Sequence, residues 1–244
     1  MEKLQFENEQ FLLYSPDSLK YITDNMQDIL VKSFEFYKIL FDIDNFRKFQ
    51  INYFDDIEKF RNYIYYLRGE KESLPKYAKG TFDNGMVNSY ISPNIDVNSI
   101  QYHKTLYMAS HELFHIMYKE LIWEKEKKDR IVWFDEGMAQ LFSGENDFNL
   151  NEENFSNWFS YVLNKTNEIP NMNELKHGSS FENDKYSGYN LSLLSVKYLY
   201  ETLGQEEFKK LMYDNNIILE YGKTVVQDSI DYYQKKVKQN KNSR

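Results

Sequence analysis

The chain has 244 residues, and the 41% that are hydrophobic provide enough apolar material for a buried core, which argues against wholesale disorder. Asp and Glu total 38 against 30 Lys and Arg, and the net charge of −8 disfavours binding to nucleic acid or to anionic membrane surfaces. The absence of Cys from the sequence excludes disulfides, thiolate metal ligands and a cysteine nucleophile.

No apolar run in the sequence reaches membrane-spanning length, and the first residues lack the basic and apolar pattern of a secretory signal. We therefore expect no membrane span and, by default, a cytoplasmic protein. A secreted protein that had lost its signal would have the same sequence, so that alternative stays open.

The first half of the chain alternates predicted strands with predicted helices. Residues 4–14 are rich in Phe, Leu and Tyr and predict one or two strands. Residues 15–18, Ser-Pro-Asp-Ser, are typical of a helix start, and hydrophobic residues then recur at helical spacing to Phe41. The further elements predicted here are a strand over 49–54, a short helix opened by Asp55-Asp56, a polar turn region over 69–80, a strand over 85–91 and a helix over about 103–120.

After residue 130 the strand signals fade and helical patterns remain. Ser187 is a candidate N-cap for one of these helices, and Gly204 is a candidate stop. The helices are predicted over residues 134–144, 151–164, 188–203, 205–214 and 224–238. The sequence thus predicts one α+β domain over residues 1–244, with a small mixed sheet and helices over 1–120, a mainly helical lobe over 121–238 and a flexible tail over 239–244.

His111, Glu112 and His115 belong to the sequence His-Glu-Leu-Phe-His on the helix predicted over 103–120. Because the two histidines are four residues apart, their rings project from one face of the helix, one turn apart. Two imidazoles so placed can bind one zinc ion, and Glu112 can act as general base toward a water activated by the metal. The alternative is a helix whose histidines are satisfied within the fold or face solvent.

A catalytic zinc site needs a third protein ligand, and the best candidate is Glu136, in Trp-Phe-Asp-Glu-Gly-Met-Ala at residues 133–139. The same acid can also be an ordinary helix N-terminal residue, since Asp135 and Glu136 would complement a helix dipole. Asp135 and Gln140 are candidates to support the ligands, and both can equally be solvated.

The two segments together resemble the gluzincin branch of the zincin metallopeptidases, and most closely the thermolysin-like catalytic domain of the aminopeptidase and collagenase-type families. The resemblance covers about residues 80–205 and implies a zincin-like fold and hydrolysis of peptide bonds. It also implies Zn²⁺ held by His111, His115 and Glu136. The spacing from His115 to Glu136 is slightly longer than is usual in the aminopeptidases, and the charged loop over residues 123–130 can absorb the difference.

Members of this family place a tyrosine at the start of a later helix, where its hydroxyl stabilises the oxyanion of the tetrahedral intermediate. Counted back from Gly204, Tyr189 falls at that position. Because the chain holds 21 Tyr, a coincidence stays open, and Tyr186 and His177 remain rivals for the role.

The family also runs an edge strand upstream of the metal helix, and its backbone pairs with the extended substrate. The residues that take this place, and are therefore candidates for substrate binding, are Gly85, Met86, Val87 and Asn88. Aminopeptidases carry Gly-Ala-Met-Glu-Asn there, and the Glu binds the free amino group of the substrate. Val87 stands at the position of that Glu, so the resemblance implies endopeptidase-like action more than aminopeptidase action.

The sequence therefore predicts a zinc metallopeptidase that acts on a peptide or protein substrate. The alternative from another class is a catalytically silent zincin-like module that binds peptide or a partner protein, with or without zinc. A third, weaker alternative is a metal-dependent hydrolase of a non-peptide amide or ester. The substrate and the oligomeric state are not predicted.

Overall fold

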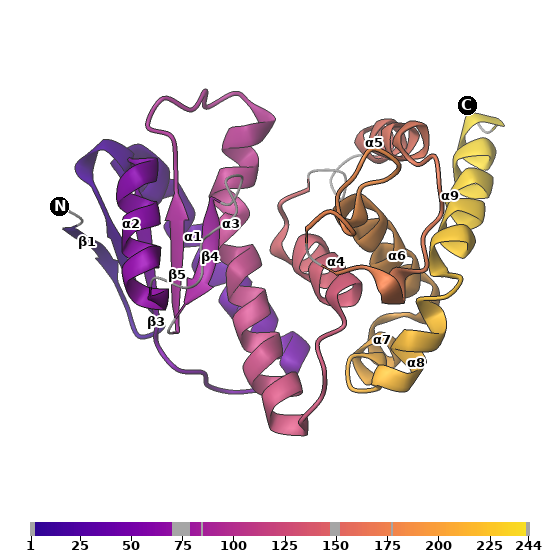
Figure 1. The fold of residues 1–244 in the computed structure, drawn as a ribbon, viewed down its shortest axis with the longest axis horizontal. Helices are drawn as coiled ribbons and strands as arrows, with labels where there is room; N and C mark the ends of the chain where they lie inside the picture. Colours follow the sequence, from indigo (N-terminus) through magenta and orange to yellow (C-terminus); the bar gives the residue numbers. More distant parts are fainter. Residues whose placement is uncertain (1–2, 70–78, 84, 147–151, 177, 243–244) are drawn as a thin grey trace. The chain divides into compact units, whose positions relative to one another are not determined.

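The computed structural model describes residues 3–69, 79–83, 85–146, 152–176 and 178–242 (Figure 1). Within these residues a five-stranded mixed sheet with its helices is followed by a mainly helical part, so the predicted α+β class is confirmed. The chain divides into two compact units, Met1–Met117 and Tyr118–Arg244, close to the lobe boundary predicted at residue 120. We call them the N-terminal and the C-terminal unit and describe each by itself.

The N-terminal unit contains the sheet. Its strands are β1 (Lys3–Glu7), β2 (Phe11–Ser15), β3 (Phe49–Phe54), β4 (Gly80–Asp83) and β5 (Met86–Tyr90). They lie in the order β1-β2-β3-β5-β4. β2, β3 and β5 run parallel to one another, while β1 and β4 pair antiparallel with β2 and β5. Within the described residues β5 is therefore an interior strand and β4 is an edge.

β4 begins in the region 69–80 that the sequence predicted to be a polar turn; residues 70–78 of that region lie outside the described residues. The strand has only four residues, Gly-Thr-Phe-Asp, and no hydrophobic alternation marks it. Its pairing with β5 and the contact of Arg68 with Asp83 hold it instead, at 2.6 Å between Arg68 Nε and Asp83 Oδ1.

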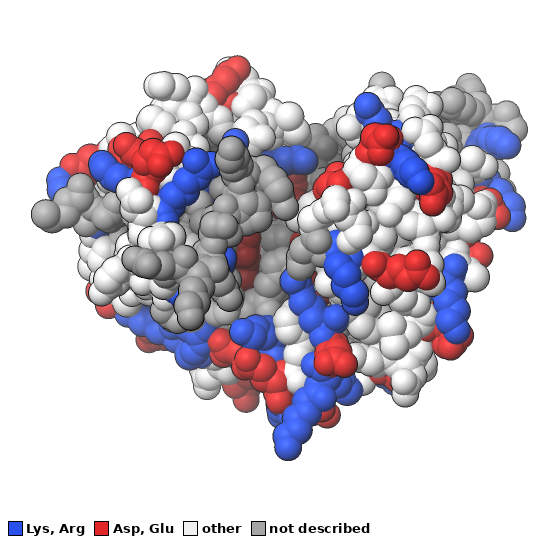
Figure 2. Space-filling view, viewed as in Figure 1, with Lys and Arg blue, Asp and Glu red and all other residues white. Residues whose placement is uncertain are grey.

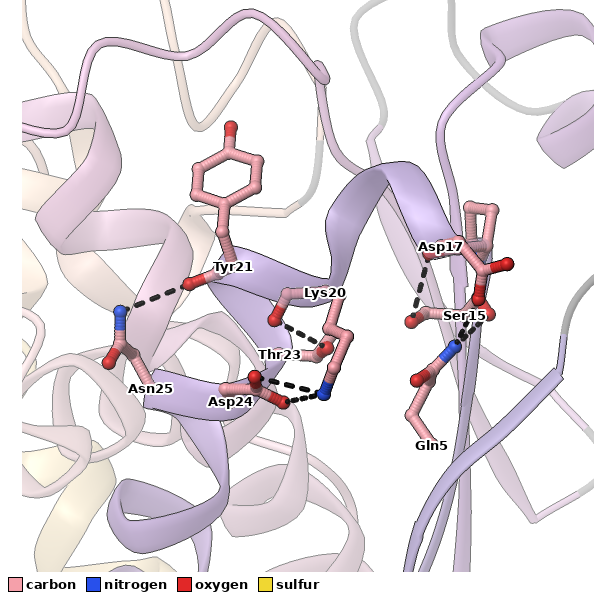
Figure 3. Close-up of polar contacts among 9 residues, drawn as sticks. Gln5, Ser15, Asp17, Lys20, Tyr21, Thr23, Asp24 and Asn25 are labelled. Carbon is pink, nitrogen blue, oxygen red and sulfur yellow. Dashed lines mark hydrogen bonds and ion pairs between the residues drawn. The ribbon is translucent and has the colours of Figure 1, made fainter.

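The helices of the N-terminal unit are α1 (Lys20–Phe41), α2 (Ile57–Arg68) and α3 (Ile100–Tyr118). A short 3-10 turn, Asp17–Leu19, leads into α1 (Figure 3). There the amide of Gln5 donates to the carbonyl of Ser15 and to Asp17, both at 3.2 Å, and thus links the first hairpin to the helix start. Asp56 caps α2 by accepting from the backbone N–H groups of Glu58 and Lys59, which confirms the predicted helix start.

The two faces of the sheet carry different helices, because side chains alternate along each strand. On one face Phe49 of β3 contacts Phe34 of α1, with ring centroids 6.3 Å apart. On the other face Phe54, the last residue of β3, packs with Phe60 and Ile64 of α2. The periodic hydrophobic stripes of α1 and α2 are thus used to cover the sheet.

α3 is fixed to α1 by both apolar and polar contacts. Phe114 is fully buried, with ring centroids 5.5 Å from Tyr37 and 5.6 Å from Phe41. The hydroxyl of Tyr37 contacts Ser110 Oγ at 2.9 Å, and Ser110 in turn bonds Ser33 at 2.7 Å. Burying one Phe side chain contributes about 1.5–3 kcal/mol, so α3 is a rigid support for the residues on its other face.

The C-terminal unit is helical in its described residues. Its helices are α4 (Val132–Ser143), α5 (Glu152–Lys165), α6 (Gly188–Leu203), α7 (Gln205–Leu211), α8 (Asn215–Tyr221) and α9 (Val225–Asn242), after a π-helical stretch over Lys119–Glu124. Ser187 caps α6 by accepting from Asn190 N–H, as predicted. The sequence missed α8, a seven-residue helix capped by the side chain of Asp214.

α9 continues to Asn242 and so includes four residues of the predicted tail over 239–244; the flexibility of this tail stays a prediction. Residues 234–242, at the end of this helix, include four Lys and two Gln, which are good helix formers. None of the described helices has both the length and the apolar composition that crossing a bilayer requires. On the face drawn in Figure 2, Lys and Arg are interspersed with Asp and Glu, so the net charge of −8 is not gathered there in one patch.

Gly137 allows α4 and α6 to approach closely. A Cβ at this position would lie 2.4 Å from the backbone carbonyl oxygen of Ser192 and 2.5 Å from a methyl group of Val196. The sequence drew attention to this glycine because it follows Glu136, and its physical role is to let the helix that carries Glu136 pack against α6.

Gly137→Ala should destabilise the protein, although Gly→Ala inside a helix ordinarily gains about 0.5–1 kcal/mol. The new methyl group would meet backbone atoms that cannot move aside, and overpacking of this kind costs about 1–3 kcal/mol or more. We expect a net loss of about 2 kcal/mol, seen as a fall in Tm of roughly 4–8 °C in thermal unfolding. An unchanged or higher Tm would contradict the close packing of α4 on α6.

Candidate metal centre

His111 and His115 form a pair on α3. Their Nε2 atoms lie 3.0 Å apart, and their ring centroids 4.7 Å apart with the planes at 76°. Both rings are half-buried, beside the buried Leu113 and Phe114. Two nitrogens on a tetrahedral zinc with bonds of ~2.0–2.1 Å would lie roughly 3.3 Å apart. The separation of the two Nε2 atoms therefore differs by only a few tenths of an ångström from that of two ligands on one ion.

Glu136 lies on α4 and is only 5% exposed. One ligand atom from each of His111, His115 and Glu136 lies within 4.8 Å of the others. Two imidazoles and one carboxylate are the donor set of several catalytic zinc sites. This group of three side chains can bind a metal ion, and the three residues are those that the sequence predicted.

Arg130 contacts the two acids of α4. Its Nη2 donates to Glu136 Oε1 at 2.7 Å, and its Nε donates to Asp135 Oδ2 at 2.6 Å. Burial alone would lower the pKa of Arg130, but the charges of Asp135 and Glu136 outweigh that effect and raise it. Asp135 is fully buried, so the alternative in which it is solvated is wrong. No sequence signal pointed to Arg130, which fell within the charged loop.

Glu112 is half-buried on α3, next to His111. A Cβ on Gly80 of β4 would lie 3.5 Å from Glu112 Oε1 and 3.1 Å from Ser89 Oγ, so the Glu112 carboxylate lies against the β4–β5 edge of the sheet. Tyr53 of β3 is fully buried close by, and burial, together with the charge of Glu112, raises the pKa of its hydroxyl. Glu112 therefore lies on the same helix as the two histidines, and its carboxylate lies near the sheet.

Tyr189 lies in the first turn of α6 and is 38% exposed, with its ring edge-on to Phe181 at 4.8 Å. Its backbone is linked to α4: the buried amide of Gln140 donates to the Tyr189 carbonyl at 3.0 Å and to the Glu136 carbonyl at 3.2 Å. Gln140 thus supports the ligand-bearing helix and is not solvated.

The rivals of Tyr189 are placed differently. The hydroxyl of Tyr186 donates to the carbonyl of Ser180 at 3.2 Å, so it is already used within its own loop. His177 lies outside the described residues. The role of oxyanion donor stays a prediction, with Tyr189 as its first candidate.

The predicted edge strand over Gly85, Met86, Val87 and Asn88 is wrong. Gly85 lies in the turn before β5, and the other three lie in β5, which pairs with β3 on one side and β4 on the other. Val87 and Asn88 are at most 1% exposed. Because both sides of β5 are paired, its backbone cannot receive a substrate strand. Asn84 lies outside the described residues.

Comparison with models of known protein families finds no match to this chain, and comparison with curated proteins finds no similar sequence. The assignment of a function therefore depends on the geometry and chemistry of the site itself.

Replacing His115 by Ala should abolish metal binding, because it removes one of two converging imidazoles. Elemental analysis of the purified protein should find about one metal ion per chain in the native protein and none in His115→Ala. His103→Ala is a matched control, since His103 lies on the same helix with its ring 4.8 Å from Tyr107 and outside the ligand group. A metal-free native protein, or equal loss in both variants, would contradict the site.

Proposed function

We propose that the protein is a zinc-dependent hydrolase of peptide bonds with endopeptidase-like action. The observation that carries the proposal is the convergence of His111, His115 and Glu136 with a half-buried Glu112 on the helix of the two histidines. This combination brings three ligands and a candidate general base into one place.

The donor set supports zinc. Two imidazole nitrogens and a carboxylate suit Zn²⁺, whereas Mg²⁺ and Ca²⁺ prefer oxygen ligands alone. Iron(II) oxygenases also use two histidines and one carboxylate, but the acid directly beside the first histidine favours hydrolysis. The elemental analysis that counts the ion also identifies it.

Zinc bound by these residues would supply Lewis-acid activation of a water and of the scissile carbonyl. Glu112 accepts the proton of the attacking water and later delivers it to the leaving amine. The hydroxyl of Tyr189, a residue that is 38% exposed at the start of α6, is the candidate donor to the oxyanion. Gln140, bonded to the Tyr189 carbonyl, keeps the first turn of α6 on α4.

β4 replaces β5 as the candidate strand for aligning the substrate. It is a sheet edge within the described residues, and an extended peptide can add to such an edge through backbone hydrogen bonds. Gly80, at the start of β4, faces Glu112. An added strand at this edge would bring its backbone toward the candidate general base.

The same strand supports endopeptidase-like action. The acid of β4 is Asp83, and Arg68 binds it through both Nε and Nη2, at 2.6 and 3.2 Å. A carboxylate held in this way is already neutralised and is a poor anchor for the free amino group of a substrate. Peptides with a blocked N-terminus should therefore be cleaved as well as free ones.

Glu112→Gln should retain zinc and lose activity by about 10²–10⁴-fold, because the amide cannot accept the proton. The substrate is first found by exposing a complex peptide mixture, free and N-terminally blocked, to the native protein with and without chelator. The rate of cleavage of the best peptide is then measured for the native protein and for Glu112→Gln. Glu126→Gln, which removes an exposed acid from the segment after α3, is the control and should retain full activity.

The outcomes separate the alternatives. Wild-type turnover by a zinc-loaded Glu112→Gln would contradict the mechanism. Zinc binding without cleavage of any peptide would instead favour the catalytically silent module. Chelator-sensitive cleavage of a small-molecule ester panel, with no peptide cleaved, would favour a hydrolase of another bond.

A further inference from the structure

Arg130 stands between three groups of the C-terminal unit. Its guanidinium lies 5.3 Å from the centroid of the Trp123 ring and contacts both Asp135 and Glu136. Arg130 precedes α4 by two residues, so it reaches forward to the first turns of the helix whose acids it binds. A planar guanidinium with several donors can stack on an aromatic ring while it bonds two carboxylates.

Arg130 brings a cation to two neighbouring buried acids. The side chain of Asp135 is fully buried and that of Glu136 is 7% exposed, and they are neighbours in the sequence. Two buried carboxylates without a counter-charge repel each other, and a buried charge without a partner is strongly unfavourable. Without Arg130 the Glu136 side chain would relieve the repulsion by turning away from Asp135, and therefore away from its present position.

We propose that Arg130 is a positioning residue for the metal centre: it binds Asp135 and Glu136 together, offsets one of their two charges and thereby holds Glu136 in the orientation of a metal ligand. A carboxylate can accept about four hydrogen bonds, so the bond from Arg130 leaves acceptor positions for an ion. The inference rests on the proposed function only in that Glu136 is taken as a metal ligand.

The Trp123 ring is part of the same arrangement. The guanidinium carbon of Arg130 lies over this ring at 5.3 Å from its centroid, and a cation attracted to the ring face is restrained in the oxygens that its N–H groups can reach. Lysine carries the same charge as a single compact ammonium and cannot hold two carboxylates in a fixed fork. The proposal therefore predicts that charge alone does not replace Arg130.

The test measures the zinc dissociation constant by competition with a chromogenic chelator, which needs no substrate. Arg130→Met should raise Kd by about 10–100-fold, the usual cost of losing a partner of a metal ligand. Arg130→Lys should give an intermediate value. Arg61→Met removes an arginine paired with a surface acid, Glu58, and should leave Kd unchanged.

A double-mutant cycle with Asp135→Asn separates positioning from a general contribution to folding. In Asp135→Asn the charge next to Glu136 is absent, so Glu136 is no longer repelled by its neighbour. The effect of Arg130→Met on the zinc Kd should therefore be smaller by about threefold or more in this background. A structural role alone would give the same loss in both backgrounds. Circular dichroism of the metal-free variants checks that each is folded.

A folded Arg130→Met with the native zinc affinity would overturn the proposal and leave the proposed function standing. Equal losses in the two backgrounds would overturn the charge-balance explanation. Failure of both Arg130→Met and Arg130→Lys to fold would make Arg130 a structural residue and also overturn it. A native protein without zinc affinity would overturn the proposed function as well.

Discussion

The site depends on two imidazole rings held one helical turn apart, with their Nε2 atoms at 3.0 Å. At this distance two nitrogen lone pairs repel each other unless a proton or a cation lies between them, so the pair is a natural place for positive charge. The helix that carries the rings is fixed from behind by Phe114 and by the contact between Tyr37 and Ser110. A rigid helix with this spacing is what a preorganised ligand pair requires.

The two buried acids of α4 are a second feature that is typical of a functional site. Asp135 and Glu136 are both buried, and burial of two carboxylates with one arginine costs more than apolar side chains of the same size would. Perturbed or crowded ionisable groups of this kind are concentrated at functional sites. Gly137 then allows the helix that carries them to pack closely on α6, where Gln140 bonds the backbone of Tyr189. The segment from Asp135 to Gln140 therefore holds both the buried acids and the residues that pack α4 against α6.

The sequence could predict what depends on local pattern. Three such features are confirmed: the helical periodicity to Phe41, the caps Asp56 and Ser187, and the placement of His111 and His115 one turn apart on α3. Each is a pattern that spans only a few neighbouring residues. Glu136 was found because an acid followed by glycine is also a local signal.

The order of strands in a sheet depends on pairing between residues that are far apart in the sequence. The position of β5 inside the sheet follows from the pairing of β4, four residues without a hydrophobic pattern, and the sequence therefore assigned the edge to the wrong strand. Arg130 was missed for a related reason: an arginine in a charged loop has no pattern that shows which acids it will meet. The end of α9 was predicted four residues too early, because residues 239–242 are all polar and resemble a solvated tail.

X-ray absorption spectroscopy at the zinc edge of the metal-loaded protein tests the central claim most directly. The account predicts a first shell of nitrogen and oxygen donors alone, at about 2.0–2.1 Å, with the multiple-scattering signal of two imidazoles. A spectrum without an imidazole contribution, or one typical of zinc bound only by water and carboxylates, would contradict it.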